Sequence, residues 1–287
     1  LSLALDQSTF DCSETGGNPV VLTVTDNNGN ISTCGATVTV EDNIPPTILS
    51  DANNSTVECD GAGNLTDLNS WLTSNGGASA TDNCINVTWS HDFTALSDDC
   101  GATGSATVTF TATDDSGNAS TTSAVFTIVD TTAPSIGTVA VNETVECDGA
   151  GNTADLAAWL LANGGAAASD VCGGVTWSNN SSGLSDLCGA TGAETVTFTA
   201  TDDCGNTSAT SATFTIEDTD APSIDIAAAD ETVECDGAGN ATEFAAWLAI
   251  NGGAAASDVC GGVMWSNNST GLSNLCGATG AETVTFT

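Results

Sequence analysis

The chain has 287 residues, of which 37 are Asp or Glu and none is Lys or Arg, so its formal net charge is −37. Nucleic acid is excluded as a partner because binding to backbone phosphates requires cationic side chains, and anionic membrane surfaces are excluded for the same reason. Twelve cysteines indicate an oxidising compartment. No apolar run of about 20 residues, the length of a membrane-spanning helix, is present.

A repeat of about 88 residues runs through the whole chain. The octapeptide VECDGAGN starts at Val57, Val145 and Val233. Linker prolines keep the same spacing at Pro46, Pro134 and Pro222. We therefore expect a string of similar modules rather than one large domain.

This spacing divides the chain into four parts. Residues 1–46 are the C-terminal part of one module, residues 47–134 and 135–222 are whole modules, and residues 223–287 are a truncated module. The alternating run that ends at Thr287 has no terminating turn, so we expect the natural polypeptide to continue at both ends.

A short helix is predicted near the start of each module. Leu68, Trp71 and Leu72 are spaced i, i+3, i+4, and residues 75–77 read Asn-Gly-Gly, which predicts an amphipathic helix with a glycine stop. The counterparts are Leu156, Trp159, Leu160, Phe244, Trp247 and Leu248.

The remaining pattern is mostly that of strands. Residues 86–90 read as one strand, and residues 106–113 alternate small or apolar residues with Thr. The turn sequence 114–118 and a second alternating run at 122–129 complete a β-hairpin. Each module is therefore expected to be a small β-sandwich that carries one helical insert.

Several short segments resemble the HYR (hyalin repeat) family. They are the linker 130–134 (DTTAP), the loop 80–83 (ATDN) and the ending 110–118 (FTATDDSGN). The form with VECDGAGN, helix and Trp is similar to repeats of giant surface adhesins of Bacteroidetes, including SprB-type gliding adhesins. The resemblance implies an immunoglobulin-like fold in a secreted, surface-attached, multi-repeat protein, exported by the type IX system.

The fold expected from pattern and resemblance is all-β, with tandem immunoglobulin-like β-sandwich repeats that each carry a short helical insert. Trp89, Trp177 and Trp265 resemble the buried strand-C tryptophan of immunoglobulin sandwiches. The alternative is that the tryptophans are exposed platforms on which a ligand stacks, and we expect them to be core.

The four cysteines of a full module, Cys147, Cys172, Cys188 and Cys204, allow three pairings, and the sequence alone does not choose among them. The strand order implied by the resemblance places Cys172 and Cys204 at one end of the sandwich and Cys147 and Cys188 at the other. It therefore favours the pairs Cys147–Cys188 and Cys172–Cys204. The other pairs expected by the same scheme are Cys12–Cys34, Cys59–Cys100 and Cys235–Cys276.

One cysteine is left over by this scheme. Ser116 stands where the next module has Cys204, so Cys84 is expected to be a free thiol. It is either a redox or cross-linking site or, as we expect, a buried inert thiol. Cys260 is expected to lose its partner to the truncation.

Carboxylates recur at module boundaries, in the linkers, in the loops before strand C and in the hairpin turns. They are Asp42, Asp130, Asp218, Asp82, Asp170, Asp258, Asp114, Asp115, Asp202 and Asp203. If these groups converge, they repel one another unless a cation lies among them, and hard oxygen ligands suit calcium. The alternative is that they are turn-forming aspartates that accept hydrogen bonds from the nearby backbone.

Phosphate-binding loops, a Ser/His/Asp set and zinc-binding spacings are all absent from the sequence, so we expect no enzymatic activity. The function expected is an extracellular, cell-surface adhesin stalk or filament stiffened by disulfides and calcium, with an unidentified surface or glycan ligand and self-association along the filament. The alternative is an array of calcium-dependent glycan-binding modules. Specific binding of one whole module on a glycan array would favour that alternative.

Overall fold

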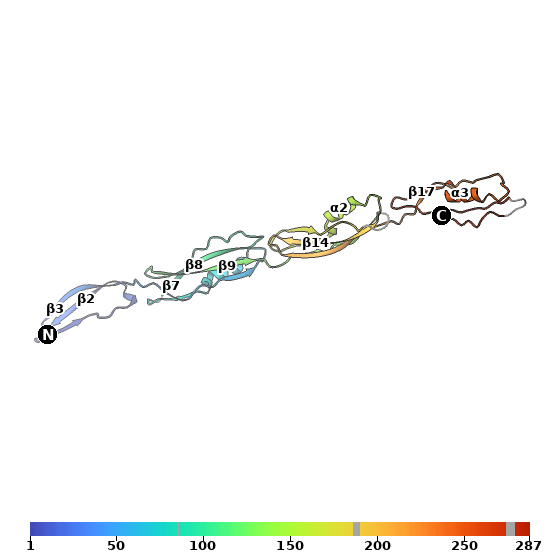
Figure 1. The fold of residues 1–287 in the computed structure, drawn as a ribbon. Coiled ribbons are helices and arrows are strands. Elements are labelled where there is room, and N and C mark those ends of the chain that lie inside the picture. Colours follow the sequence, from blue (N-terminus) through green and yellow to red (C-terminus); the bar gives the residue numbers. More distant parts are fainter. Residues whose placement is uncertain (85, 186–189, 274–278) are drawn as a thin grey trace. The chain divides into compact units, whose positions relative to one another are not determined.

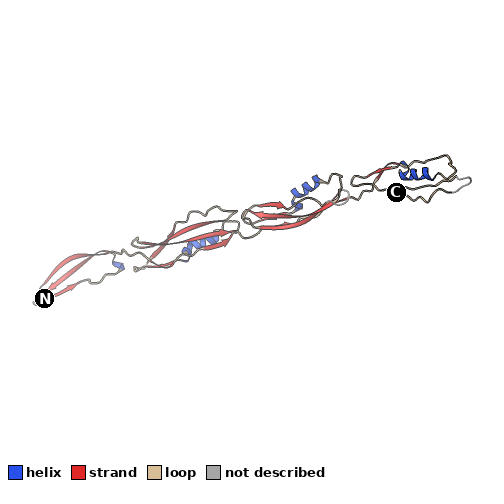
Figure 2. Cartoon of the chain, viewed as in Figure 1, coloured by secondary structure: helices blue, strands red, loops and turns tan. Residues whose placement is uncertain are grey.

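The computed structural model describes residues 1–84, 86–185, 190–273 and 279–287. Within these ranges strands predominate, and a short α-helix follows each copy of VECDGAGN (Figures 1 and 2). No helix in these ranges is long and apolar enough to cross a membrane. The contacts divide the chain into two compact units. Unit 1 comprises Leu1–Ala133, Asp170–Gly174 and Asp202–Asn206, and unit 2 comprises Pro134–Ser169, Val175–Thr201 and Thr207–Thr287.

Unit 1 begins with a three-stranded antiparallel sheet in the order β1-β2-β3. Its strands are β1 (Ser2–Leu5), β2 (Gly16–Thr25) and β3 (Ile31–Val40), and the 3-10 turn η1 (Cys12–Glu14) precedes β2. Asp26 closes the turn between β2 and β3, because its Oδ1 accepts hydrogen bonds from the backbone N–H groups of Asn28 and Asn30. This is the backbone-mimicking turn typical of aspartate.

The rest of unit 1 is a sandwich of two sheets. The four-stranded sheet has the order β5-β9-β8-β7 and the two-stranded sheet pairs β4 with β6. The strands are β4 (Thr47–Ser50), β5 (Ser55–Glu58), β6 (Ser79–Thr81), β7 (Val87–His91), β8 (Gly104–Asp114) and β9 (Ala119–Val129). β5 pairs parallel with β9, whereas β7–β8 and β8–β9 are antiparallel. An early edge strand parallel to the last strand, with the other pairs antiparallel, is an immunoglobulin-like arrangement.

The predicted hairpin is confirmed and forms the core. Along β8 the residues Val108, Phe110 and Ala112 are fully buried, and across the ladder Phe126 of β9 is equally buried. The intervening threonines face away because successive side chains of a strand point to opposite faces. Small and apolar residues in alternation with Thr thus give each strand one face that is buried in the core.

The predicted helix is also confirmed, as α1 (Leu65–Thr73), and it covers this core. Leu68, Trp71 and Leu72 are its buried residues. The Trp71 ring lies 5.2 Å from that of Phe110 in an edge-to-face contact, and its Nε1 donates a 2.9 Å hydrogen bond to the carbonyl oxygen of Asn53. The helix ends before the 3-10 turn η2 (Asn75–Gly77), as the predicted glycine stop requires.

Unit 2 repeats the same pattern. Its four-stranded sheet has the order β11-β15-β14-β13, and two-stranded sheets pair β10 with β12 and β16 with β17. The strands are β10 (Ser135–Thr138), β11 (Glu143–Glu146), β12 (Ala167–Ser169), β13 (Val175–Asn179), β14 (Gly192–Asp202), β15 (Thr207–Glu217), β16 (Ser223–Ile226) and β17 (Ala255–Ser257). The helices are α2 (Thr153–Leu161) and α3 (Ala241–Ala249), followed by the 3-10 turns η3 (Asn163–Gly165) and η4 (Asn251–Gly253).

The expected all-β class with short helical inserts is therefore confirmed. The tryptophans of the first two helices, Trp71 and Trp159, are buried, and Trp89 and Trp177 pack against the two hydrophobic cores. Trp265 is half-buried. The predicted module boundaries stay a prediction, since the compact units divide the chain at other places.

Candidate functional site

The candidate site is the junction where one repeat meets the next. Two loops of the 135–222 repeat, Asp170–Gly174 and Asp202–Asn206, belong to unit 1 by their contacts. They lie against the end of the sandwich formed by the preceding repeat. Disulfides, glycine contacts and carboxylates all gather at this place.

Four disulfides hold the described parts of the chain together. They are Cys12–Cys84, Cys59–Cys172, Cys100–Cys204 and Cys147–Cys260. Each joins a cysteine of one repeat to a cysteine of the following repeat, and the sequence separations range from 72 to 113 residues. The repeats are thus bridged to one another.

The pairing expected within each repeat was wrong wherever the structure tests it. Cys59 does not bond Cys100, Cys172 does not bond Cys204, and Cys147 does not bond Cys188. The physical reason is that cysteines at one end of a sandwich face the cysteines of the adjoining repeat. Cys172 and Cys204 do share an end, as expected, but they close across the junction onto Cys59 and Cys100.

The predictions for single cysteines change accordingly. Cys84 is not a free thiol, because it bonds Cys12, and Cys260 keeps a partner in Cys147. Cys34 does not bond Cys12 and is an exposed free cysteine. The predicted partners Cys188 and Cys276 lie outside the described residues, so the expected bond from Cys235 stays a prediction.

Two glycines allow the repeats to approach closely. A Cβ atom added to Gly61 would lie 2.5 Å from the carbonyl oxygen of Val171, and one added to Gly101 would overlap the carbonyl oxygen of Cys172. The Cys172 oxygen also accepts a 2.7 Å hydrogen bond from the backbone N–H of Ala102. In unit 2 a Cβ atom added to the equivalent Gly149 would lie 2.6 Å from the carbonyl oxygen of Val259. Backbone therefore packs directly on backbone at the junction.

The octapeptide VECDGAGN forms a loop that is closed by its own side chains. Asp60 Oδ1 accepts hydrogen bonds from the N–H groups of Ala62 and Asn64, and these bonds lower the pKa of Asp60. Asn64 is 2% exposed and has a left-handed backbone with φ +49°. Its Nδ2 donates to the carbonyl oxygen of Glu58, and its Oδ1 accepts from the N–H of Asp60. Side-chain hydrogen bonds therefore hold the loop on both sides of Gly61 and position this glycine at the junction.

The glutamate of the same octapeptide holds the linker. Glu58 Oε1 accepts a 2.7 Å hydrogen bond from the backbone N–H of Thr131, and its two oxygens accept from the hydroxyls of Thr131 and Thr132. These bonds lower the pKa of Glu58. Glu146 holds Thr219 in the same way. The chain has no Lys or Arg, and neutral N–H and O–H groups are the donors here.

Two pairs of the predicted metal ligands come together. Ligand atoms of Asp42 and Asp82 lie within 4.8 Å of one another, and those of Asp130 and Asp170 do the same. Cys84 and Cys172 lie in these two groups but are disulfide-bonded, so they are not thiolate ligands. The candidate metal ligands in both groups are therefore the aspartate carboxylates alone.

In three of these aspartates, Asp42, Asp82 and Asp130, one carboxylate oxygen accepts a hydrogen bond from the local backbone and the other has no partner among the described residues. Oδ1 of Asp42 accepts from the N–H of Ile44, that of Asp82 from Cys84, and that of Asp130 from Thr132. The Oδ2 atoms of Asp42, Asp82 and Asp130 are buried and have no hydrogen-bond partner in the described parts of the chain. Both expected roles, turn former and cation ligand, are therefore open to the same side chain through different oxygens.

Electrostatics around Asp130 confirm that carboxylates converge there. Burial raises the pKa of Asp130, and the neighbouring Asp170, Asp202 and Glu58 raise it further, while the hydrogen bond from Thr132 lowers it. The net direction is upward, which means that the ionised form is disfavoured. A cation placed between these groups would remove that penalty.

The other predicted ligands have different roles. Asp114 and Asp202 are turn formers, since Oδ1 of Asp114 accepts from the N–H groups of Ser116 and Asn118 and the turn at Asp202 is equivalent. Asp115 accepts from Asn86 Nδ2, and Asp203 accepts from the N–H of Gly174. Within the described ranges Asp218 and Asp258 belong to no such cluster: Asp218 is exposed and Asp258 binds the N–H of Cys260.

The hairpin turns also reach the linkers, through an asparagine that the sequence analysis did not single out. Asn118 Nδ2 donates a 2.9 Å hydrogen bond to the carbonyl oxygen of Asp42, and Asn206 Nδ2 donates to that of Asp130. Each junction thus joins a linker, a hairpin turn and the loop before strand C. The recurrence of Asn at the end of every hairpin turn was the available signal.

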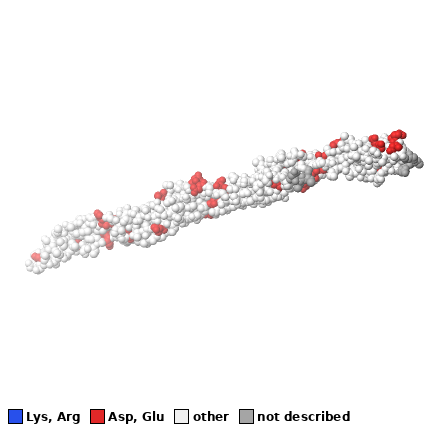
Figure 3. Space-filling view, viewed as in Figure 1, with Lys and Arg blue, Asp and Glu red and all other residues white. Residues whose placement is uncertain are grey.

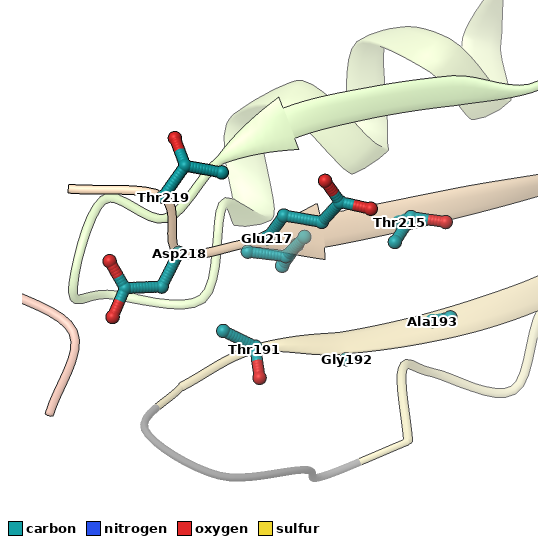
Figure 4. A pocket seen from close by; sticks show the side chains of 8 residues that line it. Thr191, Gly192, Ala193, Thr215, Glu217, Asp218 and Thr219 are labelled. Atoms are coloured by element: carbon teal, nitrogen blue, oxygen red, sulfur yellow. The ribbon is translucent and has the colours of Figure 1, made fainter.

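Figure 3 shows acidic side chains in small groups separated by uncharged surface. A shallow hollow in unit 2 lies at the ends of β14 and β15 and is lined by Thr191, Glu217, Asp218 and Thr219 among others (Figure 4). No aromatic side chain lines it, and Trp71 and Trp159 are buried, so these two are core residues and not platforms.

No protein-family model matches the chain, and no curated protein matches it. Solved structures that resemble it include the protocadherin gammaB7 EC3–6 cis-dimer, at 16% identity and a TM-score of 0.27 over 80% of this chain and 65% of that one. The mouse clustered PcdhgC3 EC1–3 structure has 15% identity and a TM-score of 0.27, over 71% of this chain and 77% of that one. The titin I-band fragment I67–I69 has 9% identity and a TM-score of 0.30, over 70% of this chain and 75% of that one. At these values the assignment of an immunoglobulin-like sandwich rests on the strand order of the chain itself.

Proposed function

We propose that the chain is part of an extracellular repeat stalk of a bacterial cell-surface adhesin, in which disulfides bond each repeat to the next. The observation that carries this proposal is the pairing of all four described disulfides between consecutive repeats. Repeats that contact only their neighbours build length by addition. A bridge at every junction suits a protein that must keep its repeats in series.

The setting proposed is the cell surface. Structural disulfides persist in oxidising environments and are rare in reducing cytosol. The net charge of −37 and the lack of any Lys or Arg keep such a stalk soluble and self-repelling. The resemblance of the linker and hairpin motifs to HYR modules supports an adhesin, and a gliding adhesin in particular, with a surface or glycan ligand and self-association along a filament.

We further propose that calcium binds at the junctions. The residues that would hold it are Asp130 and Asp170, with Asp202 nearby, at one junction and Asp42 and Asp82 at the other. The buried, unpartnered Oδ2 atoms of Asp42, Asp82 and Asp130 fit this role, because an ionised carboxylate oxygen can only accept and no donor reaches it. Calcium prefers oxygen ligands of this kind.

The location is tested by shaving intact cells with a protease. Trypsin has no site in the chain, so a protease that cuts after Asp or Glu is required. We expect the repeats to be released from intact cells with their disulfides oxidised. Recovery of the chain only from lysed cells, with its thiols reduced, would contradict a surface stalk.

The cation is tested by thermal melts of the full chain with chelator, calcium or magnesium. We expect calcium to raise the melting temperature, and Asp130→Asn to reduce the rise. The asparagine oxygen can still accept from the N–H of Thr132, so the variant removes charge and keeps the turn. Asp98→Asn, at an exposed position, is the matched control. Equal calcium responses in both variants would contradict the site at Asp130.

A further inference from the structure

We propose that the disulfides form a covalent shortcut that carries tension from repeat to repeat and leaves the hairpin core of each sandwich unloaded. This rests on the proposed function as a stalk, because only a stalk is loaded along its length. The inference follows from which cysteines are paired and from their order along the chain.

The shortcut enters and leaves each repeat through nearby cysteines. The 47–134 repeat is bonded to the chain before it at Cys84 and to the chain after it at Cys59. These two residues are about 25 positions apart, and that segment can extend to roughly 90 Å. The following repeat is entered at Cys172 and left at Cys147, with the same spacing.

The loaded segment between Cys59 and Cys84 contains α1 and β6. The hairpin formed by β8 and β9 lies outside it, together with the fully buried Phe110 and Phe126. Pulling on the chain therefore leaves the β8–β9 ladder free of load. The helix, which packs on the core through Leu68, Trp71 and Leu72, bears the load instead.

The same pairing limits how far the chain can be stretched. From Leu1 to Thr287 the shortest covalent route crosses Cys12–Cys84, Cys59–Cys172 and Cys147–Cys260. It contains about 90 residues and reaches roughly 300 Å, whereas the reduced chain of 287 residues reaches roughly 1,000 Å. Any additional bridge could only shorten the route.

The two bridges at one junction are not equivalent under load. The route passes through Cys59–Cys172, and Cys100–Cys204 lies off it. If Cys59–Cys172 is removed, the shortest route follows the backbone from Cys84 to Cys147 and grows by about 13 residues, or roughly 45 Å. If Cys100–Cys204 is removed, the limit does not change.

The experiment stretches the full chain between its two ends in optical tweezers, below the force that breaks covalent bonds. We expect the oxidised chain to stop near 300 Å and the reduced chain to extend about three times further. The paired variant C59S/C172S should extend by roughly 45 Å more than the wild-type chain. The matched variant C100S/C204S, which also lacks one bridge at the same junction, should stop at the wild-type length.

An oxidised chain that extends to roughly 500 Å would overturn the shortcut, because pairing within repeats gives a route of about that length. Equal lengthening in C59S/C172S and C100S/C204S would overturn it as well. The proposed surface stalk is judged separately by protease shaving of cells. A cytoplasmic chain with a 300 Å limit would refute the stalk alone, and a surface chain without that limit would refute the shortcut alone.

Discussion

Gly61 packs its α-carbon against the carbonyl oxygen of Val171, so that an added Cβ would lie 2.5 Å from this oxygen. The two residues belong to consecutive repeats, and the contact sits beside the Cys59–Cys172 bridge. The glycine of a repeated octapeptide is therefore part of the junction and not only of a turn.

Replacement of this glycine should destabilise the junction. Gly61 and Gly63 both have positive φ, +73° and +84°, but a Cβ on Gly63 meets nothing within 4 Å. We expect Gly63→Ala to cost about 1–2 kcal/mol for backbone strain alone. Gly61→Ala should cost more, because the steric overlap with Val171 is added. Denaturant unfolding of both variants measures the difference, and equal costs would contradict the contact.

The odd cysteine of the first whole repeat can be given a partner. Ser116 occupies the position that is Cys204 in the next repeat, and Cys12 occupies the position of Cys100. Since Cys100 bonds Cys204, Ser116→Cys should capture Cys12 and release Cys84 as a thiol. Alkylation followed by non-reducing peptide mapping detects the exchange. Ser120→Cys, in the same strand region, is the control, and unchanged Cys12–Cys84 pairing in Ser116→Cys would contradict the equivalence.

Glu194 accepts hydrogen bonds from residues 181–183, and this should make the stability of the protein depend on pH. Burial alone would raise the pKa of Glu194, but hydrogen bonds from the Ser182 and Gly183 N–H groups and the Ser181 hydroxyl hold it below the ordinary 4.5. A carboxyl group whose pKa is lower in the folded than in the unfolded state adds stability at pH values above its unfolded pKa. This stability is lost as the pH falls through its folded pKa. We expect Glu194→Ala to cost about 1–3 kcal/mol at neutral pH.

The measurement for Glu194 is a series of unfolding curves from pH 7 to pH 2. The difference between wild type and Glu194→Ala should shrink as the pH falls below 4.5. Glu143→Ala, at an exposed position in the same repeat, serves as the comparison. A difference that stays constant across the series would mean that the carboxylate charge plays no part.

The effect of calcium should also depend on pH, although the pKa of Asp130 is shifted in the opposite direction to that of Glu194. Because the pKa of Asp130 is raised, the chelated protein is penalised once this group ionises, and its stability falls as the pH rises through that pKa. Calcium should therefore raise the melting temperature at neutral pH and have little effect well below the ordinary value of 3.8. Melts at several pH values, with and without chelator, provide the measurement. A calcium response that persists at pH 2 would locate the ion elsewhere.

Trp71 should be a determinant of stability. Its ring contacts Phe110 and Phe126, with centroids 5.2 and 5.4 Å apart, and it is 9% exposed. We expect Trp71→Ala to cost about 3–5 kcal/mol. Leu65→Ala lies on the same helix at a residue that is 62% exposed and should change stability by less than about 0.5 kcal/mol. Comparable losses in the two variants would contradict the packing.

The sequence predicted the parts of the fold that depend on local pattern. The spacing of Leu68, Trp71 and Leu72 predicted the helix, and the alternation around Phe110 predicted the hairpin. This works because side chains return to the same face with different periods in helices and in strands. The strand order implied by the family resemblance placed Cys172 and Cys204 at the same end of a sandwich. The pairing could not be read in this way, since it depends on which surfaces adjoin across a junction.

A signal for that pairing was nevertheless present. The 47–134 repeat has three cysteines, and an odd number cannot close within one module. A bond across repeats gives Cys84 a partner in Cys12. The junction contacts of Gly61 and Asn206 had a weaker signal, because recurrence in a repeat does not say whether a residue serves its own module or the next.

The bridges have a consequence for how the protein matures. In the proposed surface stalk, a bond from Cys59 to Cys172, or from Cys147 to Cys260, cannot form until the later repeat has been exported and has folded far enough to bring its cysteine close. In such a stalk, oxidation at a junction follows the export of the later repeat. Each newly exported repeat of the proposed stalk thus supplies the cysteines that complete the disulfide bonds of the repeat before it.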